Sequence, residues 1–337
     1  MLVLRQTYCD DNREVRSAVE ILSEVEVKRL LSSIKKVSVE ILTENELYSL
    51  ISEGNIIAYI GYEPSNILHI GSLVACSPLL LLAKHGFKCK ILLADVHAWL
   101  NGKGELEELR EIGKQNEKML RKVCKAFGVD PESVEFVYGS DYQFSEDYVK
   151  VLLKFSQHIT ASKARKAMDM ISKKEVSHKV SSEIYALMQC IDIFYLKVNV
   201  AIGGTDQRKI HVMARDYLHK INYIKPVAIH TPILLGIDGR QKMSKSLNNA
   251  IFLNDPPEQI EHKIRKAYCP EGSPERNMIF DILQYIVLPW EKSIEIGGRA
   301  YSDMSRILKD WTEKRITAKT LKKAVAEALI QILRKLS

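Results

Sequence analysis

Three polar side chains recur along an otherwise apolar helix near the middle of the chain. In the stretch SSEIYALMQCIDIFYL, Tyr185, Gln189 and Asp192 occupy positions i, i+4 and i+7, which places them on one face of a helix. Their neighbours are apolar almost all round, so the helix is predicted to be buried. Because a buried carboxylate without partners costs several kcal/mol, the stripe is expected either to line a polar cavity or to form an internal hydrogen-bond network.

A glycine turn between a strand and a helix suits a nucleotide. In YIGYEPSNILHIGSLV, Gly61 ends an apolar strand and Gly71 opens the following helix. Backbone amides at a helix N-terminus bind phosphate, and glycines let it approach closely. His69 and Ser72 would add hydrogen-bond donors. Glycines also occur in turns for backbone reasons alone, and a single histidine is often structural, so this turn leaves both interpretations open.

A second strand, glycine turn and helix follow in AIGGTDQRKIHVMARDYL. Gly203 and Gly204 end the strand, so Asp206 and Gln207 are expected to project over the carboxyl end of the sheet, where open α/β sheets bind ligands. An acid in that position commonly holds a ribose hydroxyl. Neither glycine turn matches the GxGxxG pattern of dinucleotide-binding proteins, which argues against an oxidoreductase.

The polar loop DGRQKMSKSLNN carries two lysines three positions apart. Lys242 and Lys245 alternate with Ser244 and Ser246. Two ammonium groups on a flexible loop can follow phosphate charge as it moves, and such a loop can close when nucleotide is present. The alternative is an ordinary solvated surface turn.

Short apolar runs that alternate with helical patterns predict an α/β fold. The expected strands are residues 55–62, 88–95, 134–139, 198–204 and 227–236, and the expected helices include 72–86 and 104–127. Strand, helix and strand in succession predict a parallel sheet, covered on both faces because its strands are continuously apolar. Two capping boxes, Ser23 with Glu26 and Thr43 with Glu46, predict helix starts near the N-terminus.

Composition indicates a globular protein without a membrane anchor. The chain has 337 residues, 46% of them hydrophobic, and no apolar run approaches the roughly 20 residues of a membrane span. The six cysteines form no CxxC pair, so neither a structural metal site nor a disulfide framework is predicted. The N-terminus lacks a secretory signal, and a cytoplasmic location is expected. The net charge of +7 is compatible with a polyanionic partner, although lysine-rich faces are often merely solvated.

The motifs, in their order, resemble those of class I aminoacyl-tRNA synthetases. HIGS at 69–72 and KMSKS at 242–246 are similar to the HIGH and KMSKS signatures of that class. The intervening YIGYEPS, LLADVHAWLN, YGSDYQ, YALMQCID and GGTDQRKIH resemble the tyrosyl-tRNA synthetases of the archaeal and eukaryotic type. The similarity is strong over residues 41–270 and looser through KKAVAEALIQIL near the C-terminus.

The resemblance implies a Rossmann-like parallel sheet with a connecting insertion and a C-terminal all-helical domain. The expected division is an N-terminal helical segment at 1–45, a catalytic domain at 46–255 with the insertion at about 97–180, and an anticodon-binding domain at 256–337. In the family the insertion also forms the interface of a homodimer. Helical patterning beyond the twin proline of NDPPEQI fits the last boundary.

The resemblance also implies residues that bind the amino acid. Tyr59 and Asp192 match the pair that binds the phenol of tyrosine. The remaining tyrosine contacts are matched by Glu63, Tyr185, Gln189 and Gln207. Of these, Tyr185 and Gln189 belong to the polar stripe derived above.

The ATP contacts and the catalytic groups are implied in the same way. Matched ATP contacts are Gly61, His69, Gly71, Gly204, Asp206, Lys242, Met243, Ser244, Lys245 and Ser246. The groups expected to act in catalysis are His69, Ser72, Lys242 and Lys245. Arg208 and Lys209, at the start of the helix after the glycine pair, are predicted to contact the acceptor stem of tRNA, with plain surface charge as the alternative.

Two positions depart from the family pattern. Ser72 replaces the second histidine of HIGH and is a shorter donor, so adenylate formation is expected to be slower or to use a shifted contact. Thr320 stands where this branch of the family has an acid that reads the first anticodon base. Anticodon recognition is therefore the property that the family resemblance implies least directly for this chain.

The activity implied is tyrosine activation by ATP, with magnesium carried on the ATP phosphates and no tightly bound cofactor or dedicated metal site. Tyrosyl-adenylate and pyrophosphate form first, and the tyrosyl group then passes to the terminal adenosine of tRNA(Tyr). One alternative is a tryptophanyl-tRNA synthetase, which shares the architecture but not the Tyr59 and Asp192 pair. The other is a synthetase-like RNA-binding protein that has lost aminoacylation.

Overall fold

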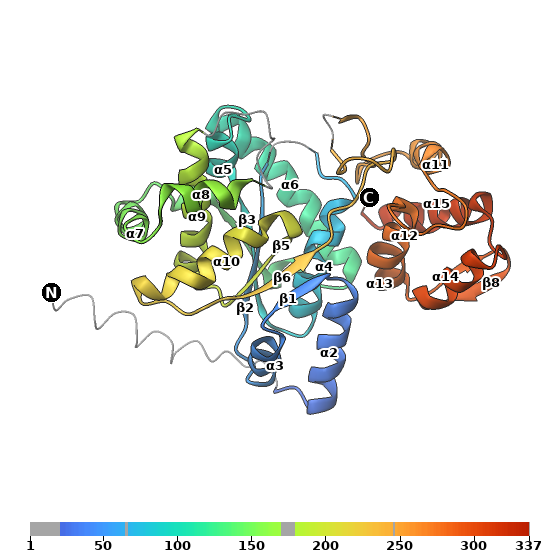
Figure 1. Ribbon diagram of the computed structural model, residues 1–337, viewed down its shortest axis with the longest axis horizontal. Helices are drawn as coiled ribbons and strands as arrows, with labels where there is room; N and C mark the ends of the chain where they lie inside the picture. The colour runs from blue at the N-terminus through green and yellow to red at the C-terminus, as the bar shows by residue number, and fades with distance from the viewer. Residues whose placement is uncertain (1–20, 65–66, 170–178, 245–246, 337) are drawn as a thin grey trace.

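A six-stranded sheet lies at the centre of the structure, a computed structural model that describes residues 21–64, 67–169, 179–244 and 247–336 (Figure 1). Neighbouring strands follow the order β1-β6-β5-β2-β3-β4. Strands β2 to β6 run parallel, and β1 pairs antiparallel with β6 at the edge. The strands are β1 (Glu40–Leu42), β2 (Ile57–Tyr62), β3 (Lys88–Leu93), β4 (Val134–Tyr138), β5 (Val200–Gly204) and β6 (Val227–Thr231). The predicted Rossmann-like parallel sheet is confirmed.

The strand order reverses between β2 and β5. From β2 the chain builds β3 and β4 on one side, then returns to place β5 on the other side of β2. The two strands pair in parallel register, with Ile60 opposite Ile202. Their carboxyl ends therefore lie side by side, and they carry Gly61 and the pair Gly203 and Gly204. In open α/β sheets this reversal leaves a crevice that binds ligands.

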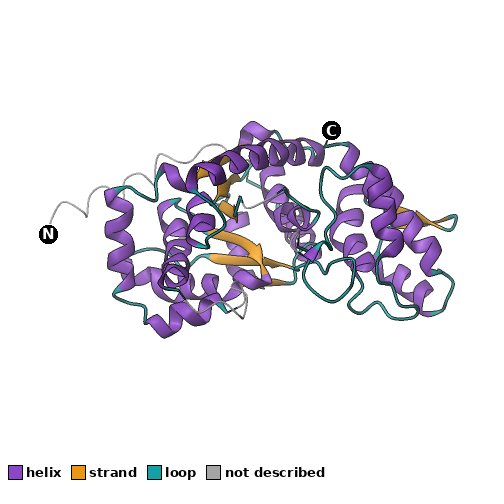
Figure 2. Cartoon of the chain, turned by 90° about the horizontal axis from the view of Figure 1, so that it is seen from above, coloured by secondary structure: helices purple, strands orange, loops and turns teal. Residues whose placement is uncertain are grey.

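Helices cover both faces of the sheet, as Figure 2 shows from above. Alternate strand residues enter two separate apolar cores: Ile60 and Ile202 face one, and Tyr59 and Ala201 face the other. The first core is completed by α2 (Glu24–Lys36), α3 (Glu44–Ser52), α4 (Gly71–Lys84) and α6 (Leu106–Phe127). The second is completed by α5 (Asp95–Leu100), α7 (Glu146–Ser156), α8 (Ala161–Met168), α9 (Val180–Tyr195) and α10 (Arg208–Tyr217). Burial on both faces explains why the strands are continuously apolar.

Short 3₁₀ helices join several of these elements. They are η1 (Pro131–Ser133), η2 (Gly139–Asp141), η3 (Thr205–Gln207) and η4 (Leu218–Ile221). Of the two predicted capping boxes, the one at Ser23 is confirmed, because its side chain and that of Glu26 bond reciprocally to backbone amides. At Thr43 the predicted helix start is confirmed, because α3 begins at Glu44, but the predicted capping box is wrong. Thr43 has a left-handed backbone with φ of 64°, and its hydroxyl donates to a Glu46 side-chain oxygen instead of capping the helix.

The C-terminal region is helical, as predicted, and also contains a hairpin that was not predicted. Its elements are α11 (Pro257–Lys266), α12 (Met278–Ile282), the π-helix η6 (Leu283–Val287), α13 (Leu288–Glu291), β7 (Ile294–Ile296), β8 (Arg299–Tyr301), α14 (Met304–Thr312) and α15 (Ala318–Arg334). Gly297 and Gly298 form the turn of the hairpin with φ of +59° and +80°, values that favour glycine. The apolar core continues from the sheet into this region, where Phe127 meets Trp290 edge-on at 5.0 Å.

The predicted segment boundaries cut across the sheet at two places. The N-terminal range 1–45 includes β1, which pairs with β6. The insertion range of about 97–180 includes β4, which pairs with β3 along five residues. The helices within that range are α6, α7 and α8, with most of α5 and the first residue of α9. The division into domains stays a prediction.

We expect the first described helix, α2, to be integral to the apolar core that packs on the sheet. Leu30→Ala should lower the free energy of unfolding by about 2–5 kcal/mol, because Leu30 is 1% exposed and packs into the core. Val25→Ala on the same helix is the matched control and should change it by less than about 0.5 kcal/mol, since Val25 is 66% exposed. Denaturant unfolding measures both. Equal effects of the two substitutions would contradict this packing.

Candidate active site

The acid of the polar stripe, Asp192, is completely buried on α9 and is held on one oxygen by three donors. The hydroxyls of Tyr142 and Tyr148 and the amide nitrogen of Gln143 each donate to Asp192 Oδ1 at 2.8 Å. All three donors come from the segment that links β4 to α7 and from α7 itself. The internal hydrogen-bond network that the sequence left as one alternative is therefore present.

The other oxygen of Asp192 faces a histidine. Asp192 Oδ2 has no hydrogen-bond partner among the described residues, and His97 Nε2 lies 3.4 Å away without a partner of its own. His97 is 2% exposed and comes from α5. Two unsatisfied polar atoms at one buried point mark a place where a ligand hydroxyl would be bound. The second alternative, a polar cavity along the stripe, stays a prediction.

Burial controls the protonation of this region. Burial raises the pKa of Asp192, whereas His97 and the three hydrogen-bond donors lower it. The pKa of Tyr59 is raised well above its ordinary value by burial and by the Asp192 charge. Tyr59, on β2, is therefore a neutral hydroxyl close to the carboxylate, as expected for a pair that binds a phenol.

A chain of amides leads from the stripe to the second glycine turn. Gln189 Nε2 donates to Gln207 Oε1 at 3.0 Å, and Gln207 Nε2 lies 3.3 Å from Asp206 Oδ1. Gln189 Oε1 is buried and has no partner among the described residues, so it can accept from a ligand ammonium group. Tyr185, 5% exposed, packs edge-on against His97 at 4.6 Å. The structure thus brings together the residues predicted to surround the amino acid, Glu63 excepted.

The carboxyl ends of the strands carry the groups predicted for the nucleotide. Lys242 Nζ lies 4.0 Å from Asp206 Oδ2. A Cβ atom on Gly204 would lie 2.7 Å from Asp206 Oδ1, so glycine is required there for the aspartate to fold back over the turn. Gly61 has open space where its side chain would be. The lysine loop and the second glycine turn therefore meet above the β2 and β5 ends.

His69 is neutral at physiological pH. Burial, with Lys242 as the second cause, lowers the pKa of His69 to about 4. Gly71 N donates to His69 Nδ1 at 3.1 Å, so the remaining proton is assigned to Nε2, which can donate to a phosphate oxygen. A Cβ on Gly71 would lie 2.7 Å from the imidazole, which explains the glycine. The Gly71 amide itself is thus engaged within the turn.

Two of the predicted site residues make contacts with other parts of the fold. Ser72 is 8% exposed in the first turn of α4, and its carbonyl accepts from the Tyr62 hydroxyl at 3.0 Å. Glu63 forms an ion pair with Lys103 and accepts from Asn101 at 2.7 Å, so its carboxylate is tied to the loop after α5. Their predicted roles at the site stay predictions.

The lysine loop is organised by a buried asparagine that the sequence analysis missed. Asn249, 3% exposed, accepts from Ser244 N at 2.8 Å, and its amide nitrogen lies 3.4 Å from the Lys242 carbonyl. Met243 is 4% exposed and anchors the loop in the core. The predicted Lys245 and Ser246 lie outside the described residues.

The basic residues predicted to contact RNA are paired with carboxylates. Arg208 Nε donates to both oxygens of Glu40, at 2.8 and 3.0 Å, and Lys209 lies 3.1 Å from Asp169. In the C-terminal region, the Thr320 hydroxyl shares a hydrogen bond of 2.8 Å with that of Thr317, the N-cap of α15.

The sequence analysis also missed the groups around Asp192. They are His97, Tyr142, Gln143 and Tyr148. No periodic spacing links them, because they lie on different elements and meet only through the packing of α5 and α7 on α9. Apart from their place in the quoted family motifs, the sequence contains no signal that could have identified them.

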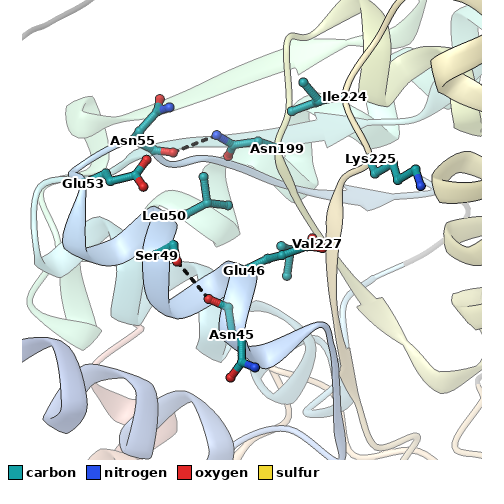
Figure 3. Close-up of a pocket in the computed structure, with 10 residues that line it drawn as sticks. All are labelled: Asn45, Glu46, Ser49, Leu50, Glu53, Asn55, Asn199, Ile224, Lys225 and Val227. Atoms are coloured by element: carbon teal, nitrogen blue, oxygen red, sulfur yellow. Dashed lines mark hydrogen bonds between the residues drawn. The ribbon is translucent and has the colours of Figure 1, made fainter.

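A cavity lies at the amino ends of the strands, opposite the candidate site. Its volume is about 450 Å³, and Figure 3 shows it between α3 and the amino ends of β5 and β6. Asn199 bridges strands there: it donates to the Asn55 carbonyl at 2.7 Å and accepts from Ile57 N at 2.8 Å. Ligands of open α/β sheets bind at the carboxyl ends of the strands, so this cavity is not part of the candidate site.

The described residues lack two features. They contain no helix long and apolar enough to cross a membrane. Nor do they contain a group of three or more His, Cys, Asp or Glu side chains arranged to hold a metal ion.

A Rossmann-like sheet whose reversal of strand order brings a buried polar stripe and two glycine turns to one edge is the arrangement of nucleotide-binding enzymes of the α/β class. Residues 52–334 match the family described as tRNA synthetases class I (W and Y), so the chain belongs to this family. The family resemblance predicted from the motifs is confirmed, and with it ATP as a substrate.

Several similar proteins are tyrosine–tRNA ligases. The tyrosine–tRNA ligase of Archaeoglobus fulgidus is 42% identical over 92% of this chain and 97% of its own, and that of Methanopyrus kandleri is 40% identical over the same shares. The crystal structure of the Archaeoglobus fulgidus tyrosyl-tRNA synthetase complexed with L-tyrosine superposes with a TM-score of 0.87, covering 92% of this chain and 98% of that one. A tryptophanyl-tRNA synthetase from Aeropyrum pernix, 21% identical with a TM-score of 0.73, shares the fold.

We expect Asn249→Ala to raise the KM for ATP about tenfold in amino-acid-dependent pyrophosphate exchange, because a buried hydrogen bond to the lysine loop is lost. The neighbouring, exposed Asn248 has φ of 49°, so Asn248→Gly preserves its backbone conformation and serves as the control. A similar KM for ATP in both variants would argue against a role of Asn249 in organising the loop.

Proposed function

We propose that this protein is a tyrosine–tRNA ligase. It activates L-tyrosine with ATP and transfers the tyrosyl group to the 3′ terminal adenosine of tRNA(Tyr). The observation that carries the proposal is the buried Asp192, whose unsatisfied oxygen lies at the end of a stripe leading to the nucleotide turn. The two tyrosine–tRNA ligases that are 42% and 40% identical to this chain support the same substrate.

In the first step, a carboxylate oxygen of tyrosine attacks the α-phosphorus of ATP, and pyrophosphate leaves. The tyrosine carboxylate is already a nucleophile, so the protein supplies alignment and stabilisation of charge rather than a side-chain nucleophile. Asp192 and Tyr59 fix the phenol, while Gln189 and Gln207 bind the ammonium end. The imidazole N–H of His69 and the Lys242 ammonium then stabilise negative charge on the phosphates.

In the second step, a hydroxyl of the terminal tRNA ribose attacks the tyrosyl carbonyl carbon, and AMP leaves. Asp206, beside the second glycine turn, is placed to hold the ribose of the adenylate. Magnesium enters on the ATP phosphates, where it neutralises charge that develops on the leaving pyrophosphate.

The tRNA is bound through its phosphates and its acceptor end. The net charge of +7 supports binding to a polyanion, and such binding weakens as salt concentration rises. Arg208 and Lys209 contact the acceptor stem and exchange their protein carboxylates for RNA phosphates on binding. The C-terminal helical region contacts the anticodon arm.

The enzyme works as a cytoplasmic homodimer, with the surface formed by α5 and α7 at the interface. Large apolar side chains are exposed on α5 (Trp99, 43%), on the segment just before α7 (Phe144, 53%) and on α7 (Leu153, 61%). Trp99 and Phe144 pack edge-on at 6.4 Å, which forms a local apolar surface. Contiguous exposed apolar side chains of this kind are typical of protein interfaces.

We predict that Asp192→Asn reduces the preference for tyrosine over phenylalanine at least about tenfold in pyrophosphate exchange, since a charged acceptor for the phenol is replaced by a neutral amide. Glu183→Gln is the control, because it removes a carboxylate from the same helix at a position paired with Arg165. An unaltered preference in Asp192→Asn would refute the assignment of the phenol site.

Arg208→Ala is expected to lower kcat/KM for tRNA in aminoacylation about tenfold and to affect tyrosine-dependent pyrophosphate exchange less, because tRNA takes part only in the second step. Lys28→Ala, which removes a surface cation paired with Glu24 on α2, controls for loss of charge. Equal losses in both assays would contradict a contact with the acceptor stem.

A further inference from the structure

The Asp192 carboxylate is held asymmetrically. Three donors converge on Oδ1, whereas Oδ2 has no hydrogen-bond partner among the described residues. An oxygen that accepts three hydrogen bonds has no free lone pair with good geometry, so a ligand can bond only to the other oxygen. The carboxylate thus presents one defined acceptor to the pocket.

Packing fixes the three donors in place. The ring of Tyr142 stacks on Tyr195 at 5.0 Å, and Tyr148 meets the same Tyr195 ring edge-on at 5.5 Å. Tyr148 is 0% and Gln143 2% exposed. A Cβ on Gly139 would lie 2.5 Å from Gln143 Oε1, so the glycine at the end of β4 leaves room for that amide. These side chains cannot turn away to water, and the hydrogen bonds are formed before any ligand arrives.

His97 completes the arrangement on the other side. Gln143 Nε2 lies 3.4 Å from His97 Nδ1, so this amide has hydrogens for both Asp192 and the imidazole. An amide donor at Nδ1 makes that nitrogen the acceptor and assigns the imidazole proton to Nε2. The N–H of His97 therefore points at Asp192 Oδ2 from 3.4 Å, longer than an ordinary hydrogen bond.

We propose that Tyr142, Gln143 and Tyr148 are positioning residues for substrate selection, which keep Asp192 ionised and aim its free oxygen at the ligand. The inference rests on the proposed function and extends it. A ring with a para hydrogen-bond donor satisfies Oδ2, whereas a plain phenyl ring leaves this buried oxygen without a hydrogen bond. The three residues act through Asp192 and do not themselves contact the phenol.

The groups facing Asp192 determine how its charge responds to pH. They are Tyr142 and Tyr148 from the β4–α7 segment and α7, His97 from α5, Tyr59 from β2, and Tyr185 and Cys190 from α9 itself. Burial raises the pKa of each phenol and of the thiol, so they stay neutral near pH 7. Burial also lowers the pKa of His97, which leaves it mainly neutral. Asp192 is therefore the ionised group of this cluster, and burial raises its pKa.

Removing a donor raises the pKa of Asp192 further, because the ionised form loses a hydrogen bond. The test measures kcat/KM for tyrosine and for phenylalanine in pyrophosphate exchange, in steps of about 0.5 pH unit from about pH 5.5 to about pH 9. The variants are Tyr142→Phe, Tyr148→Phe and the double variant. We expect the acid limb of the tyrosine profile to move to higher pH in each variant. At the acid end the preference for tyrosine over phenylalanine should fall about tenfold per hydroxyl removed.

Tyr195→Phe is the matched control. It removes a hydroxyl from the same ring cluster, and no hydrogen bond joins Tyr195 to Asp192 among the described residues. Its pH profile should coincide with that of the unaltered enzyme. A purely structural role for Tyr142 and Tyr148 would lower both substrates' kcat/KM equally without moving the acid limb, and this result would overturn the inference. Absence of tyrosine-dependent exchange in the unaltered enzyme would instead overturn the proposed function.

Discussion

The structure depends on accommodating one carboxylate inside an apolar core. Asp192 lies on a helix whose other faces pack against the sheet and against neighbouring helices, and it is completely buried. A charge in that position is tolerated only where donors converge on it, so the elements that supply them must be held in register with α9. The arrangement of α5, α7 and α9 on this face of the sheet follows from that requirement, as does the polar end of the substrate pocket.

The reversal of strand order connects this pocket to the nucleotide turn. Because β2 and β5 are neighbours although far apart in sequence, Tyr59 and the glycine pair at the end of β5 lie on adjacent strands. The amide chain from Gln189 through Gln207 to Asp206 then crosses from the amino-acid end to the ATP end. In the proposed function this continuous polar path aligns the two substrates, and alignment is the main catalytic contribution of an enzyme whose substrate supplies its own nucleophile.

Charge is distributed differently at the two ends of this path. At the amino-acid end, burial keeps the phenols and His97 neutral around one anion. At the nucleotide end, His69 is also neutral, while Lys242 is 55% exposed on a loop anchored by Met243 and Asn249. A fixed, dry site suits recognition of a small rigid ring, whereas mobile cations suit phosphates whose charge shifts during reaction.

The sequence by itself determined the parallel sheet, the buried α9 stripe, the two glycine turns and the family, because each of these leaves a local pattern of apolar periodicity, turn residues or ordered motifs. It also suggested a second capping box at Thr43, where the local pattern was overridden by a left-handed backbone. Only the tertiary structure decided which groups satisfy Asp192, how Asn249 holds the lysine loop, and that the Glu63 carboxylate turns to Lys103. These contacts join residues from separate elements, and hydrogen bonds between distant segments have no period along the chain from which they could be inferred.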